Sequence, residues 1–265
     1  MRRVPTRPRS GGAVPHVGSV GMTTHELLRI ERRFRGPDKS ANGGYTAGLV
    51  GTRLGGSGET VPQVTLRMPP PLETDLGLST GDGSAFLRAP GDTVVAEAEP
   101  VPADVLGDAA IDPVRYDEAR AAESSYRGLR NHPFPGCFVC GPENEAGLRL
   151  RPGALEDGRT ACTWTPAADL AAAEDDLVAP VHLWAALDCP GGWSIDLDGR
   201  PSVLGRMTAC VDAQPQLGEP CVIMGRNLGE SGRKTFTATT LYDSDGRILA
   251  RARHTWIAVD PALFN

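Results

Sequence analysis

The sequence predicts an α+β fold in which antiparallel strands wrap around one helix in each of two successive halves. Short strand-like runs bounded by Gly, Pro, Asn and Asp recur along the chain, and in each half one helical run precedes several strands. A Pro- and Ala-rich stretch over residues 101–130 lacks apolar periodicity and separates the halves. The two halves therefore repeat an architecture without obvious repetition of residues.

This division predicts four segments. Residues 1–22 are basic and rich in Pro, Gly and Ser, without the apolar core of a signal peptide, so we expect a disordered extension. Met22 is an alternative start of the chain. Residues 23–100 are expected to form the N-terminal half, residues 101–130 the linker and residues 131–265 the C-terminal half.

The N-terminal half combines a small-residue helix with short strands. Asn42-Gly43-Gly44 opens a run of small residues that suits a closely packed helix. Pro90-Gly91-Asp92 is typical of a hairpin turn. The predicted elements are a strand over 26–34, a helix over 46–54 and strands over 61–68, 84–88 and 93–98.

The C-terminal half repeats this order after a first hairpin. Its helix is expected to end before Pro190, because proline and the glycines after it stop regular structure. Asp245-Gly246 indicates the turn between the last two strands. The predicted elements are a hairpin of 147–151 with 159–164, a helix over 181–188, and strands over 202–212, 219–227, 233–242 and 247–259.

Composition excludes several classes of protein. Hydrophobic residues make up 40% of the chain, so most of it is expected to fold. A net charge of −6 argues against a nucleic-acid partner, and the absence of any 18-residue apolar run argues against a membrane span. Six cysteines without a secretory signal are expected to be reduced thiols, which predicts a cytoplasmic location.

Asp188 is the first candidate for chemistry. It follows an apolar helical stripe of Val181, Trp184 and Leu187, and a carboxylate in apolar surroundings can activate water. An aspartate at a helix end also commonly bonds loop amides, and that structural interpretation stays open.

His254 lies in the predicted last strand. Alternation places it with Ala250, Ala252 and Trp256 on the less charged face, which we expect to be the inner one. It would there orient water or an acyl carbonyl, or serve as a core histidine bonded to the backbone.

Two loops and a set of basic residues supply further candidates. Backbone amides of Asn42, Gly43 and Gly44 can polarise a carbonyl at a helix start, although Asn-Gly-Gly is also an ordinary helix entry. Cys137 and Cys140 have the spacing of half a zinc site, with His132 as a candidate third ligand, or they form a buried thiol or redox pair. Basic side chains suited to coenzyme A phosphates, or to a solvated rim, are Arg206, Arg226, Arg233 and Lys234.

Several enzyme signatures are missing from the sequence. It contains no phosphate-binding Gly-x-x-x-x-Gly-Lys-Ser/Thr loop, no Gly-x-Gly-x-x-Gly, no Gly-x-Ser-x-Gly elbow and no His-Glu-x-x-His. Nucleotide-dependent, α/β-hydrolase and zincin chemistries are therefore disfavoured.

The pattern over residues 24–260 resembles the hotdog superfamily, in its tandem form related to acyl-CoA thioesterase II. The resemblance is carried by Asn42-Gly43-Gly44-Tyr45, the segment 184–193, Val64-Thr65-Leu66-Arg67 before the prolines, and the closing strand 248–259. It implies a double hotdog fold, with two antiparallel sheets each wrapped around a central helix.

The resemblance also implies a catalytic set. Members of the thioesterase family use a helix Asp, a Gln on the last strand and a Ser or Thr on an intervening strand to hold water. Asp188 matches the first position, Thr208 is the candidate for the third, and His254 stands where the Gln is expected, which departs from the family pattern. The Asp-x-Asn-Pro-x-His pattern of hotdog hydratases is absent.

The leading hypothesis is an acyl-CoA or acyl-carrier thioesterase that needs no metal or other cofactor. The main alternative is a non-catalytic protein that binds acyl-CoA or another small ligand, because fold does not fix function. A scaffold protein with zinc at Cys137 and Cys140 is a third hypothesis. Exposed sheet edges predict a homo-oligomer.

Overall fold

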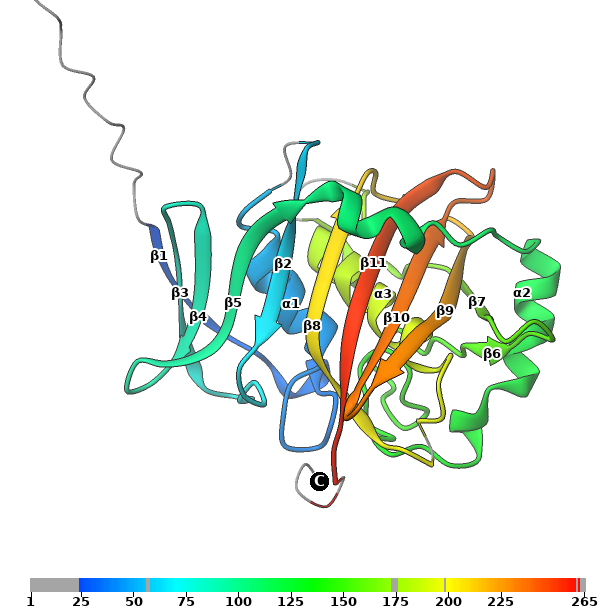
Figure 1. Cartoon of the computed structure of the whole chain (residues 1–265), viewed down its shortest axis with the longest axis horizontal. Coiled ribbons are helices and arrows are strands. Elements are labelled where there is room, and N and C mark those ends of the chain that lie inside the picture. The colour runs from blue at the N-terminus through cyan, green and yellow to red at the C-terminus, as the bar shows by residue number, and fades with distance from the viewer. Residues whose placement is uncertain (1–23, 56–57, 173–175, 198, 261, 263–265) are drawn as a thin grey trace, which may run out of the picture.

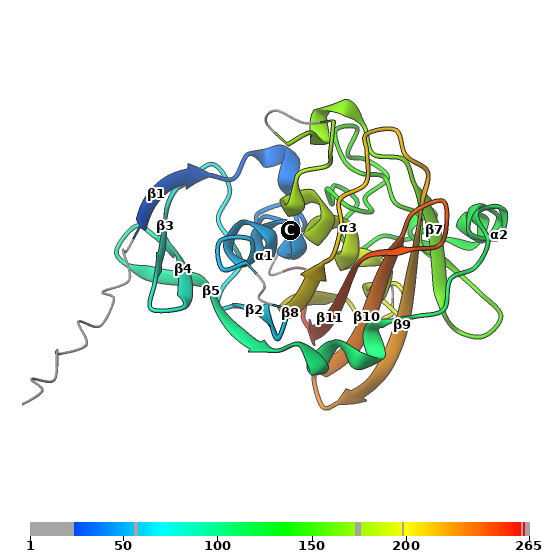
Figure 2. The same ribbon diagram turned by 90° about the horizontal axis from the view of Figure 1, so that it is seen from above.

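The structure, a computed structural model, describes residues 24–55, 58–172, 176–197, 199–260 and 262. The extension predicted over residues 1–22 lies outside the described residues. Within the described part, one curved antiparallel sheet encloses two helices on its concave face (Figures 1 and 2).

The strands follow the sequence patterns closely in the C-terminal half. In sheet order they are β1 (Thr24–Arg29), β3 (Asp75–Gly81), β4 (Ser84–Ala89), β5 (Thr93–Pro102), β2 (Thr60–Leu66), β8 (Ser202–Val211), β11 (Ile248–Ala258), β10 (Lys234–Tyr242), β9 (Cys221–Ser231), β7 (Thr160–Trp164) and β6 (Gly153–Ala154). The helices are α1 (Gly43–Gly51), α2 (Tyr116–Ala122) and α3 (Pro180–Gly192). Short 3-10 helices are η1 (Arg32–Phe34), η2 (Ala103–Ala109), η3 (Glu123–Ser125), η4 (Arg127–Leu129) and η5 (Ala168–Leu170).

The two halves share one sheet, which corrects the expectation of two. Strand β2 of the first half pairs with β8 of the second, with Val64 opposite Met207 at the centre of the junction. Both residues are fully buried. An unpaired strand edge leaves backbone N–H and C=O groups without partners, and joining β2 to β8 removes two such edges at once.

Helices α1 and α3 lie side by side and antiparallel inside the sheet (Figure 2). Glycines make this contact close, because a methyl group at Gly44 would lie 2.5 Å from Asp188 Cβ, and one at Gly48 would lie 2.8 Å from Trp184 Cβ. The start of α1 therefore meets the later part of α3. The small-residue run in the sequence had predicted a closely packed helix, and this prediction is confirmed.

Helix α3 continues past the point where the sequence predicted its end. Pro190 lies inside it, and the helix runs on to Gly192. A methyl group at Gly191 would lie 2.6 Å from Thr239 Oγ1, and one at Gly192 would lie 2.8 Å from the Trp256 ring. Close packing of these glycines on β10 and β11 supports the last turn, although proline gives up one helical hydrogen bond.

The segment 101–130 covers the outer face of the sheet rather than only bridging the halves (Figure 1). The Thr240 hydroxyl donates to the Ala109 carbonyl and accepts from the Ile111 N–H, and Arg253 donates to the Val105 carbonyl. Together with residues of β7, β9 and β10, this segment forms a second apolar core.

Other sequence predictions were wrong in detail. The strand expected over 26–34 ends at Arg29 and gives way to η1, and residues 147–151 form no strand, so the short hairpin partner of β7 is β6. Strand β3 was not predicted. None of the helices in the described ranges has the length and apolar character that a bilayer crossing requires.

Candidate functional site

A cavity of about 240 Å³ opens where the two halves meet. Its lining comes from the loop before α1, the end of β2, the loop 132–140, the end of α3, and the ends of β8 and β11. Most of the wall is apolar, including Leu66, Phe134, Leu204 and Trp256. The lining residues with polar or sulfur-bearing side chains include Ser40, Asn42, Arg67, His132, Cys137, Cys140, Asp188, Cys189 and Ser202.

Asp188 is the buried carboxylate of this cavity. Its Oδ2 accepts hydrogen bonds from Asn42 Nδ2 at 2.9 Å and from the Gly44 N–H at 3.1 Å. Its Oδ1 is equally buried and has no hydrogen-bond partner among the described residues. Hydrogen bonds to Oδ2 therefore fix the side chain, and Oδ1 is left without a hydrogen bond.

The start of α1 supplies the groups that hold Asp188. Asn42 caps the helix, because its Oδ1 accepts the Tyr45 N–H at 2.8 Å. Its amide nitrogen is then available for Asp188, so one asparagine both caps α1 and connects it to α3. Gly43 also lines the cavity, and its N–H has no partner in the described parts of the chain.

Burial governs the protonation of this carboxyl group. Desolvation raises the pKa of Asp188 to about 7, the nearby Cys137 acts in the same direction, and the bonds from Gly44 and Asn42 oppose them. A carboxylate with a pKa in this range is a stronger base than a solvated one, which suits it to accept a proton from water.

Three sulfur atoms lie beside Asp188. The Sγ atoms of Cys137, Cys140 and Cys189 lie within 4.8 Å of one another, and Cys137 Sγ is 3.8 Å from Cys189 Sγ. His132 Nε2 lies 3.3 Å from Cys140 Sγ. Asn42 Nδ2, which bonds Asp188, also lies 3.7 Å from Cys137 Sγ, so the sulfur cluster and the carboxylate share a neighbour.

His254 and Thr208 lie elsewhere. His254 is buried on the inner face of β11, as the alternation predicted, but its Nδ1 bonds Thr237 Oγ1 at 3.2 Å and it does not line the cavity. Its ring lies near the Leu187 backbone, and burial lowers its pKa to about 4. Thr208 bonds Gln63 across the β2–β8 junction and is likewise absent from the cavity lining.

Two of the four predicted phosphate-binding residues, Arg233 and Lys234, lie at the turn between β9 and β10. Arg206 on β8 donates to Thr65 Oγ1 and Arg226 on β9 donates to the Asp108 carbonyl, and neither lines the cavity. Arg233 and Lys234 are exposed. The Arg233 carbonyl accepts the N–H of Ala258, whose neighbours Ile257 and Val259 line the cavity. This turn therefore lies next to a strand end that forms part of the cavity wall.

Sequence reasoning missed Cys189. It lies 52 positions from Cys137, so no local spacing connects the two. The available indication in the sequence was its place directly after Asp188 near the end of the same helix.

Neither a protein-family model nor a curated protein matches this chain. Solved structures do match it. A protein assigned as a thioesterase in Novosphingobium aromaticivorans aligns with a TM-score of 0.61 and 13% identity, over 89% of this chain and 96% of that one. The tesB protein of Mycobacterium avium subs paratuberculosis aligns with a TM-score of 0.54 and 12% identity, over 93% and 96%.

A protein assigned as an oleoyl thioesterase in Lactobacillus plantarum aligns with a TM-score of 0.52 and 10% identity, over 92% of this chain and 99% of that one. This chain shares its fold with these three proteins. The resemblance inferred from the sequence is confirmed at the level of fold. Within this fold, Asp188 and the start of α1 meet at the cavity between the two halves.

Proposed function

We propose that this protein hydrolyses an acyl thioester of coenzyme A or of an acyl carrier protein. The observation that carries the proposal is the free, buried Oδ1 of Asp188 in a largely apolar cavity that Gly43, with its unpaired N–H, also lines. A base and an oxyanion donor at one apolar site are what hydrolysis of a thioester requires. The thioesterase fold of the chain agrees with this chemistry.

In the proposed reaction, Asp188 Oδ1 accepts a proton from a water molecule as the water oxygen attacks the thioester carbonyl carbon. The Gly43 N–H stabilises the negative charge that develops on the carbonyl oxygen. The C–S bond then breaks, the carboxylic acid is released, and the leaving thiolate takes the proton back from Asp188. Asn42 and the Gly44 N–H keep the carboxylate fixed throughout by holding Oδ2.

His254 and Thr208 have no direct contact with substrate in this proposal. His254 acts through α3, since its ring lies near the backbone of Leu187, the residue before Asp188. The apolar walls of the cavity suit the acyl group, and the exposed turn with Arg233 and Lys234 suits the coenzyme phosphates.

The alternative is a protein that binds an acyl thioester without hydrolysing it. The observation that favours it is the lack of a second polar side chain from β11 in the cavity, where the thioesterase family has a Gln. In that case Asp188 serves to bond Asn42 and Gly44 and thereby holds the two helices together.

Hydrolysis of a panel of short, medium, long and aryl acyl-CoAs distinguishes these functions. We expect turnover by the wild type, and we expect Asp188→Asn to lose roughly 10²- to 10⁴-fold in kcat because it removes the general base. Asparagine keeps the size of the side chain. Loss of thioester absorbance is the appropriate readout, since thiol reagents would also react with the cysteines.

Asp243→Asn is the matched control. Asp243 is also a buried aspartate, but it bonds Arg247 at the far turn between β10 and β11 and does not line the cavity. Its variant should retain wild-type turnover. Absence of turnover with every acyl group, together with measurable binding of an acyl-CoA by calorimetry, would replace the hydrolytic proposal with the binding function.

A further inference from the structure

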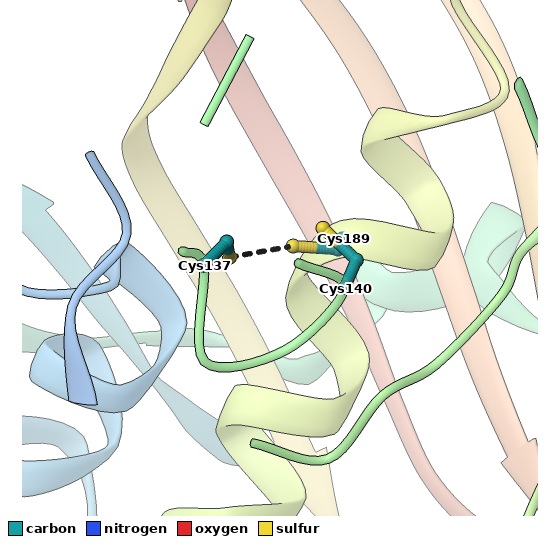
Figure 3. A group of neighbouring side chains, drawn as sticks. All are labelled: Cys137, Cys140 and Cys189. Atoms are coloured by element: carbon teal, nitrogen blue, oxygen red, sulfur yellow. Dashed lines mark hydrogen bonds between the residues drawn. The ribbon is translucent and has the colours of Figure 1, made fainter. Parts of the chain in front are cut away.

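The sulfur cluster brings together two distant parts of the chain. Cys137 and Cys140 come from the loop between η4 and β6, and Cys189 comes from α3; Figure 3 shows the three side chains converging. All three are buried, and none has a disulfide partner.

The spacing of the sulfur atoms matches that of a metal site. Zinc binds thiolate sulfur at about 2.3 Å, so two sulfurs at tetrahedral corners lie about 3.8 Å apart. Cys137 Sγ and Cys189 Sγ are 3.8 Å apart, and no pair in the cluster exceeds 4.8 Å. A disulfide requires sulfurs about 2 Å apart and joins only two of the three.

The loop is built to hold its two cysteines. The Gly141 N–H donates to the Cys137 carbonyl at 2.9 Å, which closes a tight turn around Cys-x-x-Cys. A methyl group at Gly141 would lie 2.4 Å from the Cys137 nitrogen, so only glycine fits there. The Phe138 N–H also donates to the Arg35 carbonyl at 2.7 Å, which ties the loop to the N-terminal half.

N–H groups from three directions point at the sulfurs. Cys140 Sγ accepts the Trp193 indole N–H at 3.4 Å and lies 3.3 Å from His132 Nε2. Cys137 Sγ accepts Asn42 Nδ2 at 3.7 Å. N–H donors around cysteine sulfur are typical of the outer contacts that orient metal-bound cysteines.

His132 belongs to this outer layer. Its Nδ1 accepts the backbone N–H of Phe134 at 3.0 Å, so in the neutral ring the proton lies on Nε2 and points to Cys140. A nitrogen that carries a proton has no lone pair for a metal. Within the described part of the chain, no fourth His, Cys, Asp or Glu joins the mutually close group of three.

We propose that Cys137, Cys140 and Cys189 bind one zinc ion as three thiolates, with the fourth coordination position open to the cavity. Soft thiolate ligands select zinc among the common divalent ions. The three cysteines line the same cavity as Asp188, so the open position faces the space that a ligand would occupy. Three protein ligands and one exchangeable position are typical of a zinc ion that contacts water or substrate.

Metal content of the full-length protein tests the site. The protein is expressed with zinc in the medium, purified under reducing conditions without chelator, and analysed by inductively coupled plasma mass spectrometry. We expect about one zinc per chain in the wild type, and at least a tenfold drop in bound zinc for Cys137→Ser, Cys140→Ser and Cys189→Ser. Cys162→Ser is the matched control, since Cys162 is a buried cysteine on β7 outside the cavity lining, and it should keep full occupancy.

Cobalt substitution of the wild type removes any dependence on variants that fold poorly. We expect intense sulfur-to-cobalt charge-transfer bands of the strength given by three thiolates. Adding 2-mercaptoethanol to the cobalt protein should shift these bands, because an exogenous thiolate would enter the open position. His132→Gln should weaken zinc affinity roughly 10- to 100-fold, as loss of an outer contact does, while leaving the three-thiolate spectrum.

Two results would overturn the proposal. Wild-type protein that contains no zinc and gives no thiolate bands with cobalt has no such site, whatever its hydrolytic activity. The second result has two parts: 2-mercaptoethanol leaves the cobalt bands unchanged, and His132→Gln loses metal as completely as the cysteine variants do. His132 would then be the fourth ligand, and the coordination position proposed as open would be occupied. Neither readout depends on thioester hydrolysis.

Discussion

Helices α1 and α3 occupy equivalent places in the two halves but contribute different chemistry. Helix α1 is a run of small residues, and its contribution to the site is backbone amides and the cap Asn42. Helix α3 is longer and almost entirely buried, and it carries Asp188 and Cys189. Helix α1 thus provides close approach and α3 provides side-chain chemistry, so the candidate site forms only where the two similar halves meet.

The largest effect is expected from a substitution that disrupts the contact between α1 and α3. A methyl group in Gly44→Ala would lie 2.5 Å from Asp188 Cβ and 2.9 Å from the Trp184 carbonyl oxygen. Backbone atoms cannot move aside as a flexible side chain can, so we expect the free energy of unfolding to fall by about 3 kcal/mol. Urea denaturation measures this change. Gly107→Ala, at a glycine with open space around it, should stay within about 0.5 kcal/mol of wild type.

His254 on β11 lies against α3, and the pH dependence of protein stability tests its contribution. Burial lowers the pKa of His254 to about 4, below the usual 6.5 of the unfolded chain. The folded protein therefore resists protonation that the unfolded chain accepts. The contribution of His254 to stability should be complete above pH 6.5 and should fall as pH drops from 6.5 to 4, by up to roughly 3 kcal/mol.

Comparison of wild type with His254→Gln isolates that contribution from other acid-sensitive groups. Chemical denaturation at pH 7.5 and at pH 4.5 gives the two differences in free energy. We expect the variant to lose less stability than wild type over this interval. His182→Gln on α3 offers a parallel case, since burial also lowers the pKa of His182 to about 4. Equal acid sensitivity of wild type and His254→Gln would show that His254 is protonated in the folded state.

The Asn42 side chain caps α1 and also bonds Asp188 on α3. Variants at this position therefore separate the effect of the cap from the effect of the bond to Asp188. Asn42→Ala removes the helix cap at Tyr45 and one of the two bonds to Asp188 Oδ2. We expect a loss of about 1 to 2 kcal/mol in stability and about a tenfold loss in kcat. Asn42→Ser keeps a capping oxygen but not the amide N–H, so it should restore stability more than turnover. Turnover restored as fully as stability would mean that Asn42 acts only as a cap.

The sequence predicted much of this fold where signals are local. Alternation along the last strand placed His254 and Trp256 on the inner face, and Pro90-Gly91-Asp92 marked the hairpin of β4 and β5. The shared sheet was not predicted, because pairing of β2 with β8 joins segments more than a hundred positions apart. The helical turn at Pro190 was also not predicted, because the contacts that support it come from β10 and β11, which are distant in the sequence.

The site shows the same limit. Asp188 and the Asn42-Gly43-Gly44 segment were each predicted from local pattern, and the structure brings them together. Cys189 was not predicted as a partner of Cys137, because a cluster built from a loop and a helix leaves no spacing signal. His254 and Thr208 were expected in the site from the resemblance to the thioesterase family, and the structure shows that neither lines the cavity.

The smallest expected effect concerns the outer rim of the cavity, where neither helix takes part. Arg233 and Lys234 are exposed and next to the strand end that carries Ile257. If they bind coenzyme A phosphates, Arg233→Ala and Lys234→Ala should each raise KM for an acyl-CoA by roughly 2- to 5-fold, and more at low salt, with kcat unchanged.

Two controls separate phosphate binding from a change in the cavity wall. An acyl thioester of N-acetylcysteamine, which has no phosphate, should show no change in KM with either variant. Arg115→Ala, at an exposed arginine near α2, is the control that should affect neither substrate. A KM that rises equally for both thioesters would show that the turn shapes the cavity wall through Ala258 rather than attracting phosphate.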